Sequence, residues 1–207
     1  MLDQLASEGM KFHRFFTAAP QCVPSRAALM TGRSPVAARI TRFSSPLPRD
    51  VVSLPELLRE RAGYFTGICG RSFHLDGSAN RSGDEVADLL TKHNMRTFVD
   101  RVDFLSSGAD REVADKVVSF LEKRPAEKPF FLWANFSDPH HVWNADESFR
   151  PNPDSLKIPP QFPDLPGVRK QLADYCAEVN RLDQTIGNVL DVLRKRGLQN
   201  RVLALCG

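Results

Sequence analysis

The sequence lacks an excess of charge of either sign. Its 28 Lys and Arg residues nearly balance 25 Asp and Glu residues, so the formal net charge is only +3 in 207 residues. Nucleic-acid and membrane surfaces select strongly basic patches, and this composition predicts neither kind of partner. No apolar run approaches the roughly 20 residues that a membrane-spanning helix needs.

A secretion signal is also absent from the sequence. The first residues, "MLDQLASEGMKF", have no basic start and no apolar stretch before a cleavage site. They read as the middle of a helix, and the last residues, "NRVLALCG", read as a buried strand. Both ends therefore suggest a piece of a longer domain, and the cellular compartment stays unknown.

Cysteine is scarce and is not arranged for zinc. The four residues, Cys22, Cys69, Cys176 and Cys206, form no C-x-x-C pair and no zinc-ligand spacing. Cys69, Cys176 and Cys206 lie in apolar surroundings, which predicts buried free thiols. Their spacing alone does not exclude a disulfide.

Strand-like and helix-like segments alternate along the rest of the chain. This alternation predicts an α/β fold, a mostly parallel sheet with helices on both faces. The 42% hydrophobic content is enough for a core. Helices are expected at 2–9, 25–32, 53–63, 108–124 and 169–196, and strands at 11–16, 64–70, 130–136 and 201–207, with an irregular excursion over 144–168.

Polar clusters follow two of the expected strands. "CGRSFHLDG" comes after the strand at 64–70, and "SDPHH" comes after the strand at 130–136. Ligands of parallel α/β sheets bind beyond the carboxyl ends of the strands. We therefore expect a site at this edge of the sheet, with Trp133 in the core and Trp143 as a candidate wall of a substrate cleft. Asp76 and Asp183 are expected to be solvated or capping carboxylates.

Cys22 stands out because it lies on a turn just before a helix expected to begin near Ser25. Helix N-termini favour anions, and Arg26 lies one turn further on. Position alone leaves three interpretations of Cys22 open: a buried filler, half of a disulfide, or a nucleophile in an anion site.

A longer pattern surrounds this cysteine. Cys22, Pro24, Ser25, Arg26, Thr31, Gly32 and Arg33 fit C-x-P-S-R-x-x-x-x-T-G-R, with seven fixed positions in twelve residues. The pattern resembles the signature of the type I sulfatases, members of the alkaline-phosphatase-like superfamily. The resemblance extends to three further segments: the residues before the motif, residues 53–71 and residues 175–205. It implies that residues 1–207 are a partial N-terminal catalytic domain lacking the first strand and the C-terminal part.

The resemblance implies that Cys22 is oxidised to formylglycine by a formylglycine-generating enzyme that reads the Cys, Pro and Arg positions. One hydroxyl of the hydrated aldehyde would attack sulfur and displace the alcohol or amine. The other would then help to expel sulfate by collapse to the aldehyde. In the family, the motif arginine, here Arg26, stabilises the formylglycine and the metal site.

The resemblance also implies which cations stabilise the charge that builds on the sulfuryl oxygens. The family's G-K-W-H corresponds to Gly70-Arg71-Ser72-Phe73-His74, with Arg71 in place of lysine and one residue added before His74. A guanidinium keeps the charge but changes the donor geometry. His140 corresponds to the sulfate-binding histidine, and His141 is the second choice.

The family binds one divalent cation, usually calcium, and Cys22 as formylglycine would be one ligand. The aspartate pairs that complete the site are not found in these 207 residues, so the chain alone is expected to be inactive. The family members are often periplasmic, secreted or lysosomal.

The expected substrate is a sulfated small molecule or sugar, with a weak leaning toward heparan N-sulfatase-like members. Two alternatives stay open, a phosphonate or phosphate monoester hydrolase of the same superfamily and a non-catalytic remnant.

Overall fold

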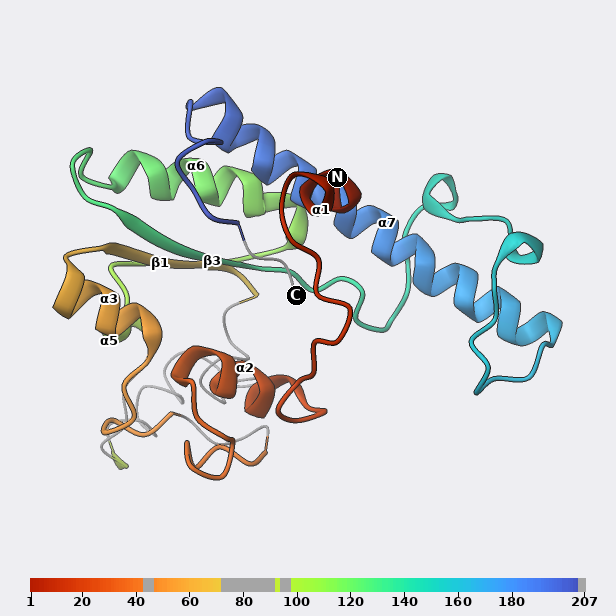
Figure 1. Cartoon of the computed structure of the whole chain (residues 1–207), viewed down its shortest axis with the longest axis horizontal. Helices are drawn as coiled ribbons and strands as arrows, with labels where there is room; N and C mark the ends of the chain where they lie inside the picture. Colours follow the sequence, from red (N-terminus) through yellow and green to blue (C-terminus); the bar gives the residue numbers. More distant parts are fainter. Residues whose placement is uncertain (43–46, 72–91, 94–97, 205–207) are drawn as a thin grey trace. The chain divides into compact units, whose positions relative to one another are not determined.

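The computed structural model describes residues 1–42, 47–71, 92–93 and 98–204 (Figure 1). The chain divides into two compact units. One unit is Phe12–Asn135, and the other combines Met1–Lys11 with the chain from Phe136 onward.

A parallel three-stranded sheet forms the centre of the unit Phe12–Asn135. Its order is β2-β1-β3, with β1 (Phe65–Gly70) between β2 (Phe104–Ser107) and β3 (Phe130–Asn135). Because all three strands run the same way, the segments that follow them lie at one edge of the sheet.

Helices cover both faces of this sheet, which confirms the expected α/β class. Figure 1 shows α6 on one side of the strands and α3 on the other. Met30, from α2, packs with Ile68 of β1 on the face opposite α6, and Trp133 packs against this cluster. The helical segments of the unit are α2 (Cys22–Thr31), α3 (Leu54–Ala62), α5 (Phe98–Arg101), the 3₁₀ turn η1 (Asp110–Glu112) and α6 (Val113–Lys123).

On the α6 face, one aromatic side chain fills the space over the middle of the sheet. The ring of Phe120 lies 5.2 Å from that of Phe65, 5.6 Å from that of Phe104 and 5.8 Å from that of Phe130. A Cβ atom at Gly67 would lie 2.6 Å from this ring. The glycine in β1 therefore lets α6 approach closely, which explains its place in a strand interior.

A buried ion pair fixes the segment before α3. Arg101 and Glu56 have fully buried side chains and are joined by a 2.7 Å contact. The Arg101 guanidinium also donates to the carbonyl oxygens of Leu47 (3.1 Å), Pro48 (2.9 Å) and Val51 (2.7 Å). One side chain thus satisfies three backbone acceptors and a carboxylate inside the core.

The same segment packs under the start of α2. Leu47 and Val51 belong to a buried apolar cluster with Val23 and Ala27 of α2, together with Ala38 and Ile40. The burial of Val23 holds the first turn of α2, and with it Cys22, against this cluster.

The other unit is built on α7 (Pro166–Lys195), a helix of 30 residues. It also contains α1 (Leu2–Glu8) and two 3₁₀ turns, η2 (Glu147–Phe149) and η3 (Pro153–Ser155). Asp183 of α7 accepts hydrogen bonds from the backbone N–H of Leu2 (2.7 Å) and from the Met1 amine (2.8 Å). Asp183 therefore has the capping role expected of it.

Several expected elements differ in the structure. The strand expected at 11–16 is wrong, because the chain bends at residues 13 and 14 and the residues there are exposed and form no strand, with Phe16 83% exposed. Residues 201–204 are not a strand either, and 205–207 lie outside the described residues. Helix α2 begins at Cys22 instead of Ser25, and α7 begins at Pro166 because proline suits the first helical turn.

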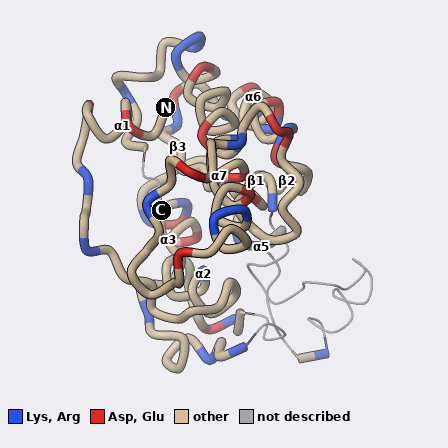
Figure 2. The backbone as a smooth tube through the Cα atoms, turned by 90° about the vertical axis from the view of Figure 1, so that its right-hand side faces the viewer, with Lys and Arg blue, Asp and Glu red and all other residues tan. Residues whose placement is uncertain are grey.

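Charges of both signs are distributed along the described chain (Figure 2). Helix α6 shows this locally, since it carries Asp115, Lys116, Glu122 and Lys123. Among the described residues, none of the helices combines the length and apolar character needed to cross a bilayer.

Candidate active site

Cys22 is the first residue of α2. It is preceded by the extended N-cap residue Gln21, whose carbonyl oxygen accepts the first helical hydrogen bond from Ser25 (2.9 Å). Pro24 has no N–H, and that of Ser25 is used within the helix. The remaining N–H groups of the first turn are those of Cys22 and Val23, at the end of the helix where the dipole favours an anion. The Cys22 side chain is half-buried and its thiol is free. The disulfide interpretation is therefore wrong in this structure.

Arg26 lies one turn into α2 and reaches the end of β3. Its Nη1 donates to Oδ1 of Asn135, the last residue of the strand, whose side chain is buried. The guanidinium carbon also lies 6.0 Å from the centre of the Trp133 ring, within the range of a cation–π contact. A polar and an aromatic contact therefore fix the direction of this guanidinium.

Arg71 follows β1 at the same edge of the sheet. Its backbone N–H donates to the carbonyl oxygen of Asn135 (3.1 Å), and the preceding Gly70 has a φ of +83°. A Cβ atom at Gly70 would lie 1.9 Å from that Asn135 oxygen. Only glycine fits where the ends of β1 and β3 approach so closely.

Burial and two neighbouring groups, Cys22 and Arg71, act on the pKa of Arg26. Burial is the main cause that lowers the pKa of Arg26, and the positive charge of Arg71 lowers it further, while Cys22 acts in the opposite direction. Arginine still stays protonated at neutral pH. Two guanidinium groups near the start of a helix provide a positive environment for a negatively charged group.

The structure thus brings together Cys22, Arg26 and Arg71, three of the six residues predicted from the sequence. His74 lies outside the described residues, as does Asp76. His140 and His141 belong to the other unit.

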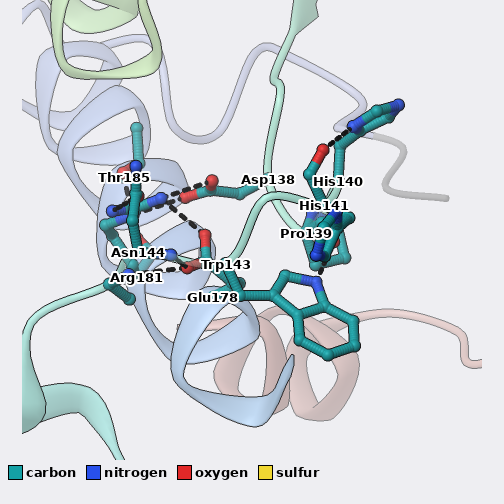
Figure 3. A network of polar contacts seen from close by, with 10 residues as sticks. Asp138, Pro139, His140, His141, Trp143, Asn144, Glu178, Arg181 and Thr185 are labelled. Atoms are coloured by element: carbon teal, nitrogen blue, oxygen red, sulfur yellow. Dashed lines mark hydrogen bonds and ion pairs between the residues drawn. The ribbon is translucent and has the colours of Figure 1, made fainter. Parts of the chain in front are cut away.

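In that unit, His140 and His141 lie on the loop that follows β3. Both side chains are exposed, and His140 Nδ1 contacts the carbonyl oxygen of His141. The His141 ring meets the Trp143 ring edge to face, with centroids 5.3 Å apart. The Trp143 indole N–H donates to the carbonyl oxygen of Pro139 (3.3 Å), so the loop is folded back on itself (Figure 3).

Calcium is implied by the family resemblance, and the described residues do not fit it by themselves. Among residues 1–42, 47–71, 92–93 and 98–204, no group of three or more His, Cys, Asp or Glu side chains is placed to hold a metal ion. Calcium takes six to eight oxygen ligands. The described residues by themselves therefore do not complete a calcium site.

The sequence analysis missed two contributors. Asn135 is the polar residue that ends an apolar strand, and that position at the sheet edge was the available signal. The charged pair formed by Asp138 and Arg181 (2.8 Å) joins residues 43 positions apart. No local pattern in the sequence connects residues so far apart.

Comparison with known proteins supports one family. The sulfatase family profile matches residues 1–204. N-acetylglucosamine-6-O-sulfatase of Bacteroides thetaiotaomicron is 30% identical over 69% of this chain and 26% of its own length. Human N-sulphoglucosamine sulphohydrolase is 27% identical over 99% of this chain and 44% of its own length.

Solved structures share the fold. A protein solved in complex with its substrate D-glucosamine-2-N,6-O-disulfate matches 96% of this chain and 55% of its own, with a TM-score of 0.67 and 18% identity. The phosphonate monoester hydrolase of Agrobacterium radiobacter gives the same TM-score of 0.67, coverage of 96% and 55%, and identity of 18%.

The chain spans less than half the length of the two relatives named, at 26% and 44%. The family profile nevertheless extends from residue 1 to residue 204 and includes Cys22, Arg26 and Arg71. This chain belongs to the sulfatase family.

Proposed function

We propose that this chain carries the nucleophile-bearing part of a sulfuric ester or N-sulfate hydrolase. The observation that carries the proposal is geometric. Cys22 and Arg26 lie about one turn apart at the start of α2, and Asn135 accepts hydrogen bonds from both the Arg26 side chain and the Arg71 backbone N–H. A sulfuryl group bears negative charge that grows on its oxygens during transfer. Fixed cations around the reacting position stabilise that charge before the reaction begins.

Each residue has a separate task in this proposal. Formylglycine at position 22 would supply a hydroxyl nucleophile and a route to release sulfate. Arg26 would donate to the oxygens of the bound group, with its direction held by Asn135. Arg71 would add a second cation from the end of β1, and His140 would contact the sulfate from its loop.

A sulfated amino sugar is the proposed substrate. The printed names of two relatives, an N-acetylglucosamine-6-O-sulfatase and an N-sulphoglucosamine sulphohydrolase, both describe sulfated glucosamine chemistry. The proposed partners are therefore a sulfated sugar and a formylglycine-generating enzyme. Calcium would be the metal, with ligands supplied from outside the described residues.

Phosphonate or phosphate monoester hydrolysis is the second candidate. The likeness to the Agrobacterium radiobacter phosphonate monoester hydrolase concerns the fold, at 18% identity. Both reactions transfer a tetrahedral anionic group, so the same two guanidinium groups would serve either. A substrate comparison separates them.

The first experiment measures the state of Cys22. The chain is co-expressed with a formylglycine-generating enzyme, and the tryptic peptide spanning residues 15–26 is weighed. Conversion of the thiol to an aldehyde lowers the mass by about 18 Da. An unmodified thiol would favour the non-catalytic remnant.

The second experiment uses a longer protein that carries residues 1–207 together with calcium ligands, because the chain alone is expected to be inactive. It measures turnover on an aryl sulfate, N-sulfated and 6-O-sulfated glucosamine, and a phenyl phosphonate, with calcium present. We expect Cys22→Ala to abolish sulfate release without unfolding the protein, while Cys176→Ser, a change at a second half-buried free thiol, leaves it unchanged. Equal turnover by the Cys22→Ala variant would remove this residue from the mechanism. Faster turnover of the phosphonate than of every sulfate would favour the second candidate.

A further inference from the structure

The loop that carries His140 and His141 is attached to one short stretch of α7 by two buried carboxylates. Before the histidines, Asp138 accepts two hydrogen bonds from Arg181, from Nε to Oδ2 and from Nη2 to Oδ1, each 2.8 Å long. This fork geometry is the strongest form of an arginine–carboxylate pair. The Asp138 side chain is only 7% exposed, so water competes little with the pair.

After the histidines, the chain is attached by Glu178. Its Oε1 accepts the backbone N–H groups of Asn144 (2.5 Å) and Ala145 (2.6 Å), and its side chain is 1% exposed. Glu178 Oε2 accepts a hydrogen bond from Nη2 of Arg181 (2.5 Å). The guanidinium therefore joins both attachment points, which lie less than one helical turn apart on α7 (Figure 3).

Arg181 also donates from Nη1 to the side-chain oxygen of Asn144 (3.0 Å). A single guanidinium thus contacts Asp138 on the N-terminal side of the histidines, Asn144 on their C-terminal side, and Glu178 on α7. The three donor nitrogens lie in one plane at fixed angles. A lysine ammonium would keep the charge but could not reach all three acceptors in this geometry.

From these contacts we infer that Arg181 is a positioning residue for the proposed reaction, fixing the loop 138–145 so that His140 is held in its sulfate-binding position. This inference rests on the proposed function for its catalytic consequence. Its structural part, that Arg181 sets the conformation of the loop, stands on the hydrogen bonds alone. Arg181 touches other protein groups in this network and acts on the substrate only through the loop.

Trp143 provides a readout of the loop that does not require activity. The sequence contains two tryptophans, and the indole N–H of Trp143 donates to the carbonyl oxygen of Pro139 within the loop. Its NMR signal therefore reports on the fold of residues 139–143. The second tryptophan, Trp133, lies in β3 and serves as an internal reference.

The test compares Arg181→Lys with the wild-type chain and with Arg194→Met. Arg194 is on the same helix and pairs with Asp191, but its side chain is 53% exposed. We expect Arg181→Lys to shift the Trp143 indole signal, to leave that of Trp133 in place, and to leave formylglycine conversion at Cys22 unchanged. In the longer protein that carries calcium ligands, the kcat/KM for the aryl sulfate should fall at least about tenfold, the size of one lost charge-assisted hydrogen bond. Arg194→Met should change none of these.

Asp138→Asn gives an independent second variant, because it keeps the side-chain shape but removes the charge that Arg181 holds. It should reproduce the Trp143 shift. If Trp143 is unmoved in both variants, the inference is overturned. If Trp143 moves but kcat/KM stays at the wild-type value, the positioning role is overturned. If the longer protein with calcium ligands is converted at Cys22 yet hydrolyses no sulfate ester, the proposed function fails, and the Trp143 signal alone decides whether Arg181 sets the loop.

Discussion

Replacing Arg101 with methionine should destabilise the unit Phe12–Asn135 more than any exposed charge change. The variant removes the partner of the buried Glu56 carboxylate and the donors of three backbone carbonyl oxygens. Breaking a buried ion pair by removing one partner costs about 3–5 kcal/mol, because the remaining charge is left in a low-dielectric interior. That is a large part of the roughly 5–15 kcal/mol that stabilises a typical domain.

Urea unfolding measures this cost. With a denaturant slope of about 1–3 kcal/mol per molar, the midpoint should fall by about 1–5 M. Arg39→Met is the matched control, since Arg39 pairs with Asp50 in an ion pair whose side chains are 55% and 69% exposed. Surface pairs contribute little, so its midpoint should stay at the wild-type value.

The double variant Arg101→Met with Glu56→Leu separates the lost pair from the stranded charge. It should recover part of the loss, because no buried carboxylate is left without its partner. A midpoint for Arg101→Met equal to that of Arg39→Met would refute the reasoning. The Leu47 and Val51 carbonyls would then not depend on Arg101, and neither would the cluster beneath the start of α2.

Three further changes address the sheet edge and the core. In the longer protein that carries calcium ligands, Asn135→Leu removes the acceptor of Arg26 and should lower kcat/KM about 10- to 100-fold without changing formylglycine formation at Cys22; unchanged kinetics would mean that Arg26 needs no support. Arg71→Lys keeps the charge and should retain activity within about tenfold, whereas Arg71→Ala should lose more; a large loss with lysine would indicate a requirement for the guanidinium. Burial raises the pKa of Cys69 from 9.0 to about 12. Between these pH values the folded thiol keeps its proton while the unfolded thiol loses it. The free energy of unfolding should therefore fall as pH rises from about 9 toward 12. Urea titrations of Cys69→Ala across that range should show a smaller fall, and an identical slope would contradict the effect.

The sequence predicted the sheet where apolar runs were long and bounded by turn residues. The expected strands at 64–70 and 130–136 and the helix over 108–124 correspond to β1, β3 and α6. The short strand β2 (Phe104–Ser107) was missed, because only its first residue is fully buried and it has little apolar pattern of its own. Its pairing with the central strand makes it a strand.

The candidate site was predicted from a motif, while its supporting contacts could not be. Cys22 and Arg26 were identified from the motif and Arg71 from the resemblance to the family, and in the fold Arg26 and Arg71 both donate hydrogen bonds to Asn135. Arg26 and Asn135 are 109 residues apart, and no periodicity links them. The strand expected at 11–16 was predicted from its β-type composition. It does not form, because it has no neighbouring strand to pair with among the described residues.

The last peptide groups of β1 have a further consequence for the residue that follows. Gly70 accepts a hydrogen bond from Gly108 N–H (3.1 Å) on one side, and Arg71 N–H donates to Asn135 on the other (3.1 Å). The backbone therefore sets where the side chain at position 71 starts, whatever that side chain is. Arginine and lysine can therefore be exchanged at this position without a change in the backbone conformation. Only the reach of the cation and the number of oxygens to which it can donate hydrogen bonds would change.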